Sequence, residues 1–277
     1  MIIDSHQHFW KYNPSRHNWI NDNMSVIRKD FMPSDLKTIY VENNIDGCIA
    51  IQVDQTINET NFLLNLAKEN TFIKGVVGWI ELRAPNINEV LNHYSNFEQI
   101  KGFRHLVQGE NDNKFLLRSE FLRGISYLEK YNYVYDILIF PNQLEMALEF
   151  VKKFPNNKFV IDHIAKPNIK DNLYREWAKL MSKISNYENV FCKMSGMITE
   201  ADYKLWTPDQ ITPYMDLVLK SFGSKRILFG SDWPVCLVAG SYKKVKELVV
   251  NFIEKLSENE KANVMGKNAI NLYNIKT

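Results

Sequence analysis

Short apolar runs alternate with longer amphipathic stretches along the whole chain. The runs are nearly unbroken, which is typical of parallel strands that are buried on both faces. They cover residues 2–8, 48–54, 73–81, 100–106, 133–140, 158–163, 189–195 and 226–231. The stretches between them have helical spacing and cover residues 35–44, 58–70, 88–97, 118–131, 141–154, 171–186 and 213–222. The sequence therefore predicts a regular succession of strand and helix.

Two further helical segments end the chain, one over 242–255 and one that begins at Ser257, where Ser257-x-x-Glu260 has the spacing of a capping box. Repeated strand and helix with right-handed crossovers predict an α/β fold, a (β/α)8 TIM barrel. We expect one domain over residues 1–277 with an extra C-terminal helix. An open doubly wound sheet is the alternative, but no glycine-rich phosphate fingerprint follows the first strand.

The composition excludes some classes of binding partner. The formal net charge is only +2 and the lysines are scattered, so we exclude a nucleic-acid surface and expect a small-molecule partner. No apolar run approaches the length of about 20 residues that a membrane helix needs. Cys48, Cys192 and Cys236 cannot all pair, and the N-terminus does not resemble a cleavable signal, so we expect a cytoplasmic protein. A homo-oligomer stays open.

The segment 9–33 is rich in Trp, Asn and Pro and has no clear periodicity. It is long for a connection in a compact domain, and long loops are commonly lids or binding loops. We therefore expect this segment, together with 197–213, to influence specificity.

Polar residues end each predicted strand. In a barrel of this kind the chemistry lies at the carboxyl ends of the strands, so these residues are the candidates for a site. In strand order they are His6 and His8; Gln52 and Asp54; Trp79 and Glu81; Arg104, His105 and Gln108; Asp136; Asp162 and His163; Lys193 and Ser195; and Asp232. Scattered surface histidines would not gather at strand ends, which indicates convergence on one site.

Three histidines and one aspartate of this set suggest a metal centre. His6 and His8 emerge on the same side of their strand, about 7 Å apart, within reach of one ion. With His163 and Asp232 they supply the ligand types of a catalytic zinc site that keeps a position open for water. The sequence predicts one divalent metal, most simply Zn²⁺; the alternative is that the histidines contact the substrate and no metal is needed.

Other strand-end and loop residues are candidates for substrate contacts. They are Gln52, Trp10, Trp79, Arg104, His105 and Lys193. Arg104 has the alternative of an ion pair with Asp54 or Glu81, Lys193 that of a salt bridge inside the barrel, and the tryptophans that of simple packing. By strand alternation, Asp4 is in phase with His6 and should face inward behind the site, whereas Asp162 should face outward.

Five motifs carry a resemblance to a known family. HQHFW (6–10), GFRHLVQ (102–108), DHIAKP (162–167), CKMSGM (192–197) and FGSDWP (229–234) resemble the amidohydrolase superfamily, in particular its sugar-lactonase branch, with the L-fuconolactonases, the L-rhamnonolactonases and their pyrone-dicarboxylate lactonase relatives. The resemblance spans residue 2 to about residue 272. It implies site roles for His6, His8, His163 and Asp232. Where a binuclear member often has a bridging lysine and a fifth-strand histidine, this chain has Arg104 or His105 and Asp136, which argues against two metals.

The resulting hypothesis is hydrolysis of a small sugar-derived lactone. Asp232 and His163 are the candidate catalytic residues: Asp232 takes a proton from the attacking water, and His163 orients the water or the carbonyl. One alternative is a metal-dependent decarboxylase or hydratase of a small unsaturated acid on the same barrel. Another is a non-catalytic protein that binds a sugar acid.

Overall fold

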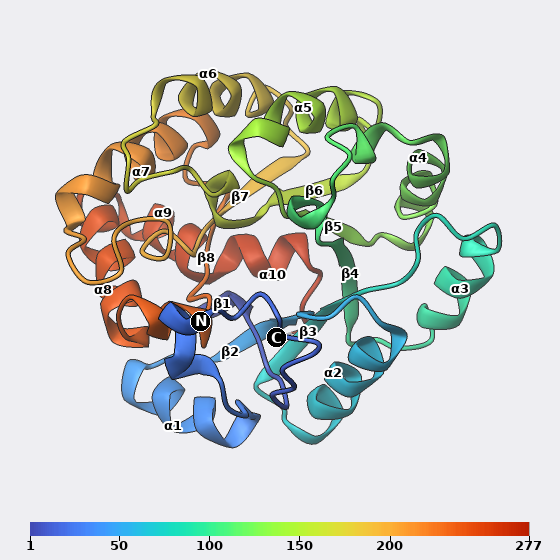
Figure 1. Ribbon diagram of the computed structural model, residues 1–277, viewed down its shortest axis with the longest axis horizontal. Helices are drawn as coiled ribbons and strands as arrows, with labels where there is room; N and C mark the ends of the chain where they lie inside the picture. The colour runs from blue at the N-terminus through green and yellow to red at the C-terminus, as the bar shows by residue number, and fades with distance from the viewer. Residues whose placement is uncertain (277) are drawn as a thin grey trace.

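Eight parallel strands form one sheet in chain order, and the computed structural model describes residues 1–276 (Figure 1). The strands are β1 (Ile3–Gln7), β2 (Gly47–Ile51), β3 (Ile73–Gly78), β4 (Ile100–His105), β5 (Val134–Ile137), β6 (Lys158–Ile161), β7 (Val190–Met194) and β8 (Ile227–Phe229). The last strand returns to the first, since the Ser5 hydroxyl donates to the Phe229 carbonyl at 2.6 Å. The sheet is thus a nearly closed barrel, and the predicted fold class is confirmed.

Helices surround the barrel, most of them between successive strands, and the last three follow β8. They are α1 (Pro33–Asn43), α2 (Ile57–Glu69), α3 (Ile87–Tyr94), α4 (Ser119–Ser126), α5 (Leu144–Lys152), α6 (Arg175–Ile184), α7 (Pro208–Phe222), α8 (Tyr242–Phe252), α9 (Glu258–Ala262) and α10 (Asn268–Leu272). Within residues 1–276, none of the helices has the length and apolar character needed to cross a membrane.

Several helix boundaries differ from the prediction by a few residues, and two of the differences have clear local reasons. The helix predicted over 213–222 begins at Pro208, because Thr207 and Gln210 form a capping box ahead of it, and Pro213 lies inside the helix. The helix predicted over 118–131 ends at Ser126. A short 3-10 turn follows, and Asn132 closes it in the left-handed conformation at φ 58°.

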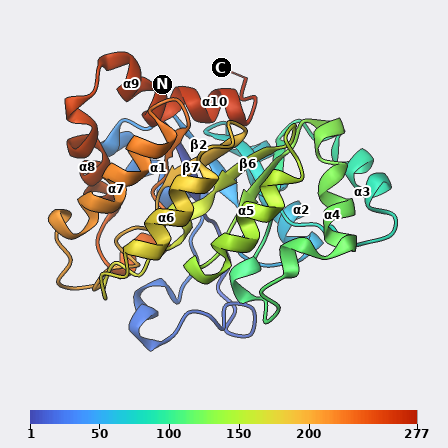
Figure 2. The same ribbon diagram turned by 90° about the horizontal axis from the view of Figure 1, so that it is seen from above.

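The apolar interior has two layers. One lies between the strands and the surrounding helices, and the other fills the barrel itself. The inner layer is made of Ile3, Ile49, Ile51, Val77, Val134, Val160 and Leu228, joined by Ala269, Leu272, Tyr273 and Ile275. Segment 268–275, with α10, therefore closes the end of the barrel where the strands begin, opposite the segment between β1 and α1 (Figure 2).

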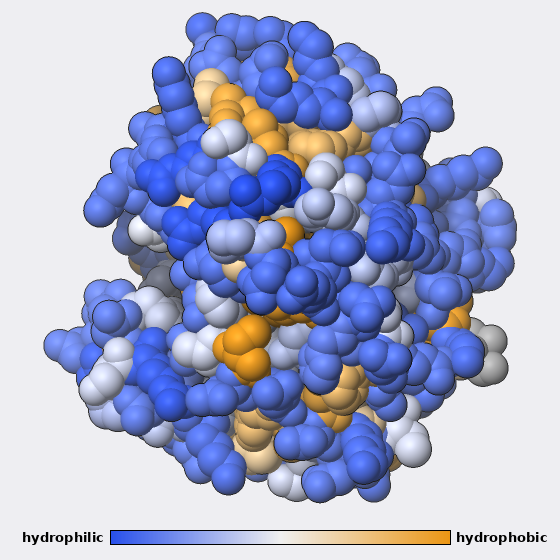
Figure 3. Space-filling model, turned by 90° about the vertical axis from the view of Figure 1, so that its right-hand side faces the viewer, coloured by the Kyte–Doolittle hydropathy of each residue, from blue (hydrophilic) through white to orange (hydrophobic). Residues whose placement is uncertain are grey.

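The outer surface is mainly hydrophilic on the face over α3 and α4, where hydrophobic residues form small separate patches (Figure 3). Most polar side chains of the barrel interior lie instead toward the carboxyl ends of the strands. This division leaves the strand ends as the place where buried polar groups gather, as the strand-end pattern predicts.

Asp4 does not face the barrel interior, so the prediction of its direction is wrong. Its Oδ2 accepts hydrogen bonds from the hydroxyls of Tyr40 on α1 at 3.0 Å and Tyr242 on α8 at 3.2 Å. The pairing of β1 with β2 shifts register between Asp4 and Gln7, which breaks the simple alternation of faces. His6 nevertheless faces inward. A one-residue irregularity of this kind is not visible in the hydrophobic pattern.

Candidate active site

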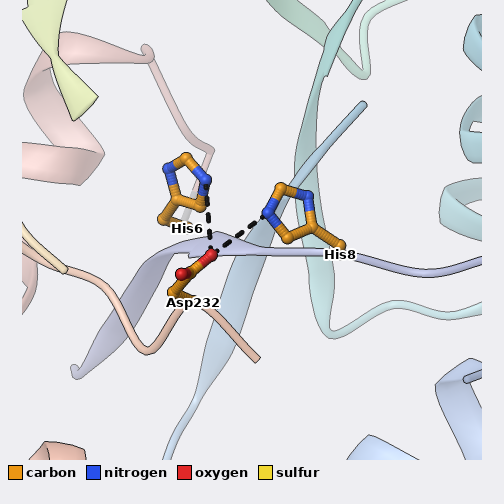
Figure 4. Close-up of side chains that lie close together, drawn as sticks. All are labelled: His6, His8 and Asp232. Carbon is orange, nitrogen blue, oxygen red and sulfur yellow. Dashed lines mark hydrogen bonds and ion pairs between the residues drawn. The ribbon is translucent and has the colours of Figure 1, made fainter. Parts of the chain in front are cut away.

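Asp232 lies among three histidines at the carboxyl end of the barrel. Its Oδ1 is 3.3 Å from His8 Nε2, 4.0 Å from His6 Nε2 and 3.9 Å from His163 Nε2. Figure 4 shows His6 and His8 directing ring nitrogens toward the Asp232 carboxylate. The residues that the sequence suggests as metal ligands therefore lie together, although three different segments of the chain supply them.

The junction of β1 and β8 holds Asp232 in place. The Asp232 amide donates to the His6 carbonyl at 2.8 Å, and the His8 amide donates to the Trp233 carbonyl at 2.7 Å. Asp4 supports the same turn, since it accepts from the Ser231 amide at 2.9 Å and the Ser231 hydroxyl at 2.6 Å. Asp232 has φ 56°, a conformation uncommon for a residue with a side chain and more frequent at functional sites.

The turn after β6 positions His163. Residues 163–166 are all in the left-handed region, with φ between 48° and 58°. Each such residue costs about 1–2 kcal/mol, so the surrounding contacts must hold the turn. One of these is the 2.9 Å contact between His163 Nδ1 and the Ser195 hydroxyl. Gly196 lies against the same ring.

Gly196→Ala is expected to displace His163. Gly196 has φ 62°, and an added Cβ would lie 2.5 Å from His163 Nδ1. We expect kcat to fall more than tenfold and the free energy of unfolding to fall by about 1–3 kcal/mol. Gly223→Ala is the control, because Gly223 has φ 66° and nothing within 4 Å of its added Cβ. Steady-state kinetics and urea denaturation measure both effects; equal kinetics in the two variants would contradict the positioning role of Gly196.

A buried set of charges lies beside the histidines. Arg104 Nη1 is 3.0 Å from Asp162 Oδ2 and 3.2 Å from His6 Nε2, and its Nη2 donates to the Gln52 carbonyl. Asp162 also lies 3.0 Å from Lys193 Nζ. The ion pair suggested for Arg104 is therefore made with Asp162, whereas Asp54 faces Arg16 and Glu81 binds Arg83.

Asp162 faces inward, contrary to the alternation argument. Strand β6 ends at Ile161, and Asp162 begins a 3-10 turn, so strand geometry does not apply to it. Burial alone would raise the pKa of Asp162, but the charges of Lys193 and Arg104 and the contact with His6 hold it well below its usual range. Asp162 is an ionised member of the site region that sequence reasoning placed on the wrong side.

Burial determines the charge state of two of the histidines. It lowers the pKa of His6 and of His163 well below the ordinary value, so both imidazoles are neutral near pH 7 and can offer lone pairs. Burial would raise the pKa of Asp232, but the neighbouring His163 and His8 lower it overall. A carboxylate facing neutral imidazoles is a suitable set of ligands for a divalent cation.

The hydrogen bonds of the rings support this reading. His8 Nδ1 lies 2.9 Å from the Ile51 carbonyl, which only accepts, so Nδ1 carries the proton and Nε2 has the lone pair. His6 Nε2 likewise faces a donor, Arg104. The atoms of His6, His8 and Asp232 that could bind a metal ion lie within 4.8 Å of one another. The residues fit a single divalent cation, with Arg104 competing for the His6 lone pair.

A cavity of about 550 Å³ opens above these groups. His8, Arg104, His163 and Asp232 line it, and it falls in the usual size range of small-molecule sites. The sequence did not single out several other residues that line it, among them Arg16, Asn18, Gln55, Lys166, Glu200 and Tyr203. Most belong to the two loops expected to influence specificity, but their type alone did not distinguish them from solvated loop residues.

The other predicted substrate contacts lie outside the lining of this cavity. Trp10 is 1% exposed and donates to the Lys29 carbonyl at 2.9 Å. Trp79 donates to His105, which stacks on Phe115 with ring centroids 4.5 Å apart. Gln52 and Lys193 are fully buried beneath the cavity, where both contact members of the charged set.

Glu59 is a buried acid next to the loop that follows β2. Its Oε1 accepts from the Val53 amide at 3.1 Å, and burial raises its pKa to about 7. A carboxyl whose folded pKa exceeds the unfolded value stabilises the protein below the unfolded pKa, and this stability is lost as pH rises through the folded pKa. The charged form therefore destabilises the fold above about pH 7.

Glu59→Gln is expected to stabilise the protein at pH 8 and to have much less effect at pH 5. The shift from the ordinary value corresponds to roughly 3 kcal/mol at full ionisation. Thermal unfolding at the two pH values measures it, with the exposed Glu69→Gln on the same helix as control. An equal effect of Glu59→Gln at both pH values would contradict the buried charge.

Comparison with known proteins places the chain in a family. The amidohydrolase family model matches residues 3–275. An L-fucono-1,5-lactonase of Burkholderia multivorans is 36% identical over 98% of this chain and 95% of its own. The crystal structure of a B. multivorans amidohydrolase with bound Zn is 36% identical, covers both chains fully and has a TM-score of 0.96. A probable 2-pyrone-4,6-dicarboxylic acid hydrolase of Acinetobacter baumannii shares the fold at 17% identity over 99% of each chain, with a TM-score of 0.77. The chain belongs to the amidohydrolase family.

Proposed function

We propose that the protein hydrolyses the ester of a small sugar-derived lactone. The observation that carries the proposal is the Asp232 carboxylate, surrounded by three imidazoles at the floor of a cavity of about 550 Å³. The names of the related lactonases support the substrate class, since two relatives called L-fucono-1,5-lactonase match at 36% and 30% identity over nearly the whole chain. L-Fucono-1,5-lactone is therefore the first substrate to test.

Asp232 is the proposed general base. It is ionised and buried, and its carboxylate faces the cavity, so it can accept a proton from a water molecule held there. That water attacks the lactone carbonyl. The Asp232 carboxyl then returns the proton to the ring oxygen as the acyl–oxygen bond breaks, which leaves a hydroxy acid.

His163 and Arg104 are proposed to assist this reaction. His163 also lines the cavity and is fixed through Ser195, so it can orient the water or the carbonyl. Arg104 carries a permanent positive charge at the same site, which favours the negative charge that develops on the carbonyl oxygen. Both roles require the side chains to be held in place before the substrate binds.

His6, His8 and Asp232, with His163 nearby, are the residues that would hold a divalent cation, most simply Zn²⁺. When bound there, such a cation supplies Lewis-acid polarisation of the carbonyl and a lower pKa of bound water. The guanidinium of Arg104 lies 3.2 Å from the His6 lone pair that the cation would use. We therefore propose a single, readily exchanged metal.

The test begins with the metal content of the purified protein. Proton release is then followed on a panel of aldonolactones, with and without a chelator. The proposal expects at least one lactone to be opened well above the uncatalysed rate, and activity lost to the chelator to return with Zn²⁺. The absence of turnover on every lactone would overturn the lactonase proposal, and full activity in a metal-free sample would overturn its metal part alone.

A further inference from the structure

A line of buried polar groups connects the bottom of the barrel with His6. Tyr273 follows α10 at the end where the strands begin, Asp136 lies on β5 and Lys193 on β7. Tyr273 is 1% exposed, and Asp136 and Lys193 are 0% exposed. Asp136 and Lys193 lie between the apolar segment 268–275, which contains Tyr273, and the site. The catalytic steps described above use none of the three residues.

The contacts are continuous. The Tyr273 hydroxyl lies 3.0 Å from each Asp136 oxygen, and Asp136 pairs with Lys193. Lys193 Nζ is 3.0 Å from Asp162 Oδ1 and 3.2 Å from His6 Nδ1. His6 Nδ1 is itself 3.2 Å from Asp162 Oδ1. Each neighbouring pair is therefore in close polar contact.

Donors face both nitrogens of His6, since Arg104 Nη1 lies at Nε2 and the Lys193 ammonium lies at Nδ1, next to Asp162 Oδ1. The proton can be on Nδ1 only while Lys193 directs its hydrogens at Asp136 and Asp162, and Nε2 then accepts from Arg104. Lys193 holds Asp162 beside Nδ1, and Asp136 holds Lys193. The uncharged Tyr273 hydroxyl donates one hydrogen to Asp136 and thereby limits where that carboxylate can lie.

A set of buried charges such as this one adds little to the stability of the folded protein. Buried ion pairs seldom stabilise a protein more than apolar residues of similar volume, because the charges lose their hydration. The hydroxyl of Tyr273, in the apolar segment 268–275, must also be placed against the Asp136 carboxylate, which is a further constraint on packing. Departures from an apolar core of this kind are expected where a site needs a fixed side chain.

We propose that Tyr273 is a positioning residue that acts through Asp136 and Lys193 to hold His6 with its Nε2 lone pair facing Arg104 and Asp232. The proposal rests on the proposed lactonase function, in which His6 is one of the residues that would hold a divalent cation. It assigns a role in the site to the C-terminal segment, at the opposite end of the barrel from the substrate. Tyr273 itself touches neither substrate nor metal.

The first test is the state of His6 in full-length, metal-free protein. Histidine is labelled with ¹⁵N, and the His6 signals are assigned with a His6→Gln variant. The wild type should show a protonated Nδ1 and an unprotonated Nε2. Tyr273→Phe, which removes only the hydroxyl, should shift both signals toward exchange between tautomers, and Asp136→Asn should do so more strongly.

Tyr135→Phe is the matched control. Tyr135 neighbours Asp136 on β5 and is equally buried, but its ring packs against Phe121 and Phe150 in the helix layer, at centroid distances of 5.8 and 5.9 Å. It should leave the His6 signals unchanged. Wild-type His6 signals in a folded Tyr273→Phe variant would overturn the proposal. Should Tyr273→Phe not fold, Asp136→Asn decides it in the same way.

The second test is kinetic. Tyr273→Phe should lower kcat roughly tenfold, as removal of a group behind a site residue typically does, with KM nearly unchanged. Weaker binding of Zn²⁺ in equilibrium dialysis should accompany the loss. If the wild type opens no lactone, the proposed function fails, and the ¹⁵N spectra still decide the role of Tyr273. If the wild type is active but Tyr273→Phe has unchanged kcat, zinc affinity and His6 signals, only the role of Tyr273 fails.

Discussion

Asp232→Asn is expected to lower kcat about a thousandfold while the protein stays folded, since a positioned general base typically contributes between 10² and 10⁴ in rate. The amide has nearly the same shape as the carboxylate, and its NH2 group can donate to His8 Nε2, which lies 3.3 Å from Asp232 Oδ1. It cannot accept a proton from water, however, and it is a poor metal ligand. The loss should therefore appear in kcat far more than in the melting temperature.

Asp216→Asn is a suitable control for this experiment. Asp216 is an exposed residue of α7 that pairs with Lys255 at 2.9 Å, and neither residue lines the cavity. Its replacement should leave kcat and KM unchanged. If Asp232→Asn retained full lactone turnover with an intact fold, the mechanism proposed for Asp232 would be wrong.

Arg104→Met should destabilise the protein by about 3–5 kcal/mol, the range for removal of one partner of a buried ion pair. Arg104 is 3% exposed and holds Asp162 at 3.0 Å and the Gln52 carbonyl as well. Without it, Asp162 keeps Lys193, which Asp136 already shares, so one buried negative charge is left uncompensated. Urea denaturation measures the loss.

Two further variants make this result specific. Arg83→Met removes a partly exposed arginine that pairs with Glu81 at 2.7 Å, and surface pairs are worth at most about 1 kcal/mol. The double variant Arg104→Met, Asp162→Leu removes both charges and should recover part of the stability lost by Arg104→Met. A loss for Arg104→Met no larger than that for Arg83→Met would contradict the buried network.

The strand-end pattern predicted the barrel and the gathering of its polar residues because both follow from short-range rules. Continuous apolar runs identify buried parallel strands, and the fold brings their carboxyl ends to one face. His6, His8, His163 and Asp232 lie together for this reason. Motifs around them also carried the family resemblance.

Side-chain directions were less predictable. Asp4 faces the helices because β1 changes register after it, and Asp162 faces inward because β6 ends one residue earlier. Trp10 donates a hydrogen bond to the Lys29 carbonyl, and both residues belong to the loop between β1 and α1. None of these causes leaves a mark in the hydrophobic periodicity.

Long-range partners were not predictable at all. The Arg104–Asp162 pair joins residues 58 positions apart, and Tyr273 reaches Asp136 across 137 positions. A tyrosine after an amphipathic C-terminal helix is typical of packing, and only the closed barrel shows its hydroxyl at a carboxylate. Such contacts depend on which elements the fold places opposite one another.

The most direct measurement follows the carbonyl carbon of the substrate. L-Fucono-1,5-lactone with ¹³C at the carbonyl is incubated with the protein and the products are observed by NMR, with Asp232→Asn in parallel. The account predicts conversion of the lactone carbonyl to a carboxylate, far faster than in buffer or with the variant, and no labelled carbon dioxide. Conversion no faster than in buffer across this lactone and the related aldonolactones, or release of labelled carbon dioxide, would contradict it.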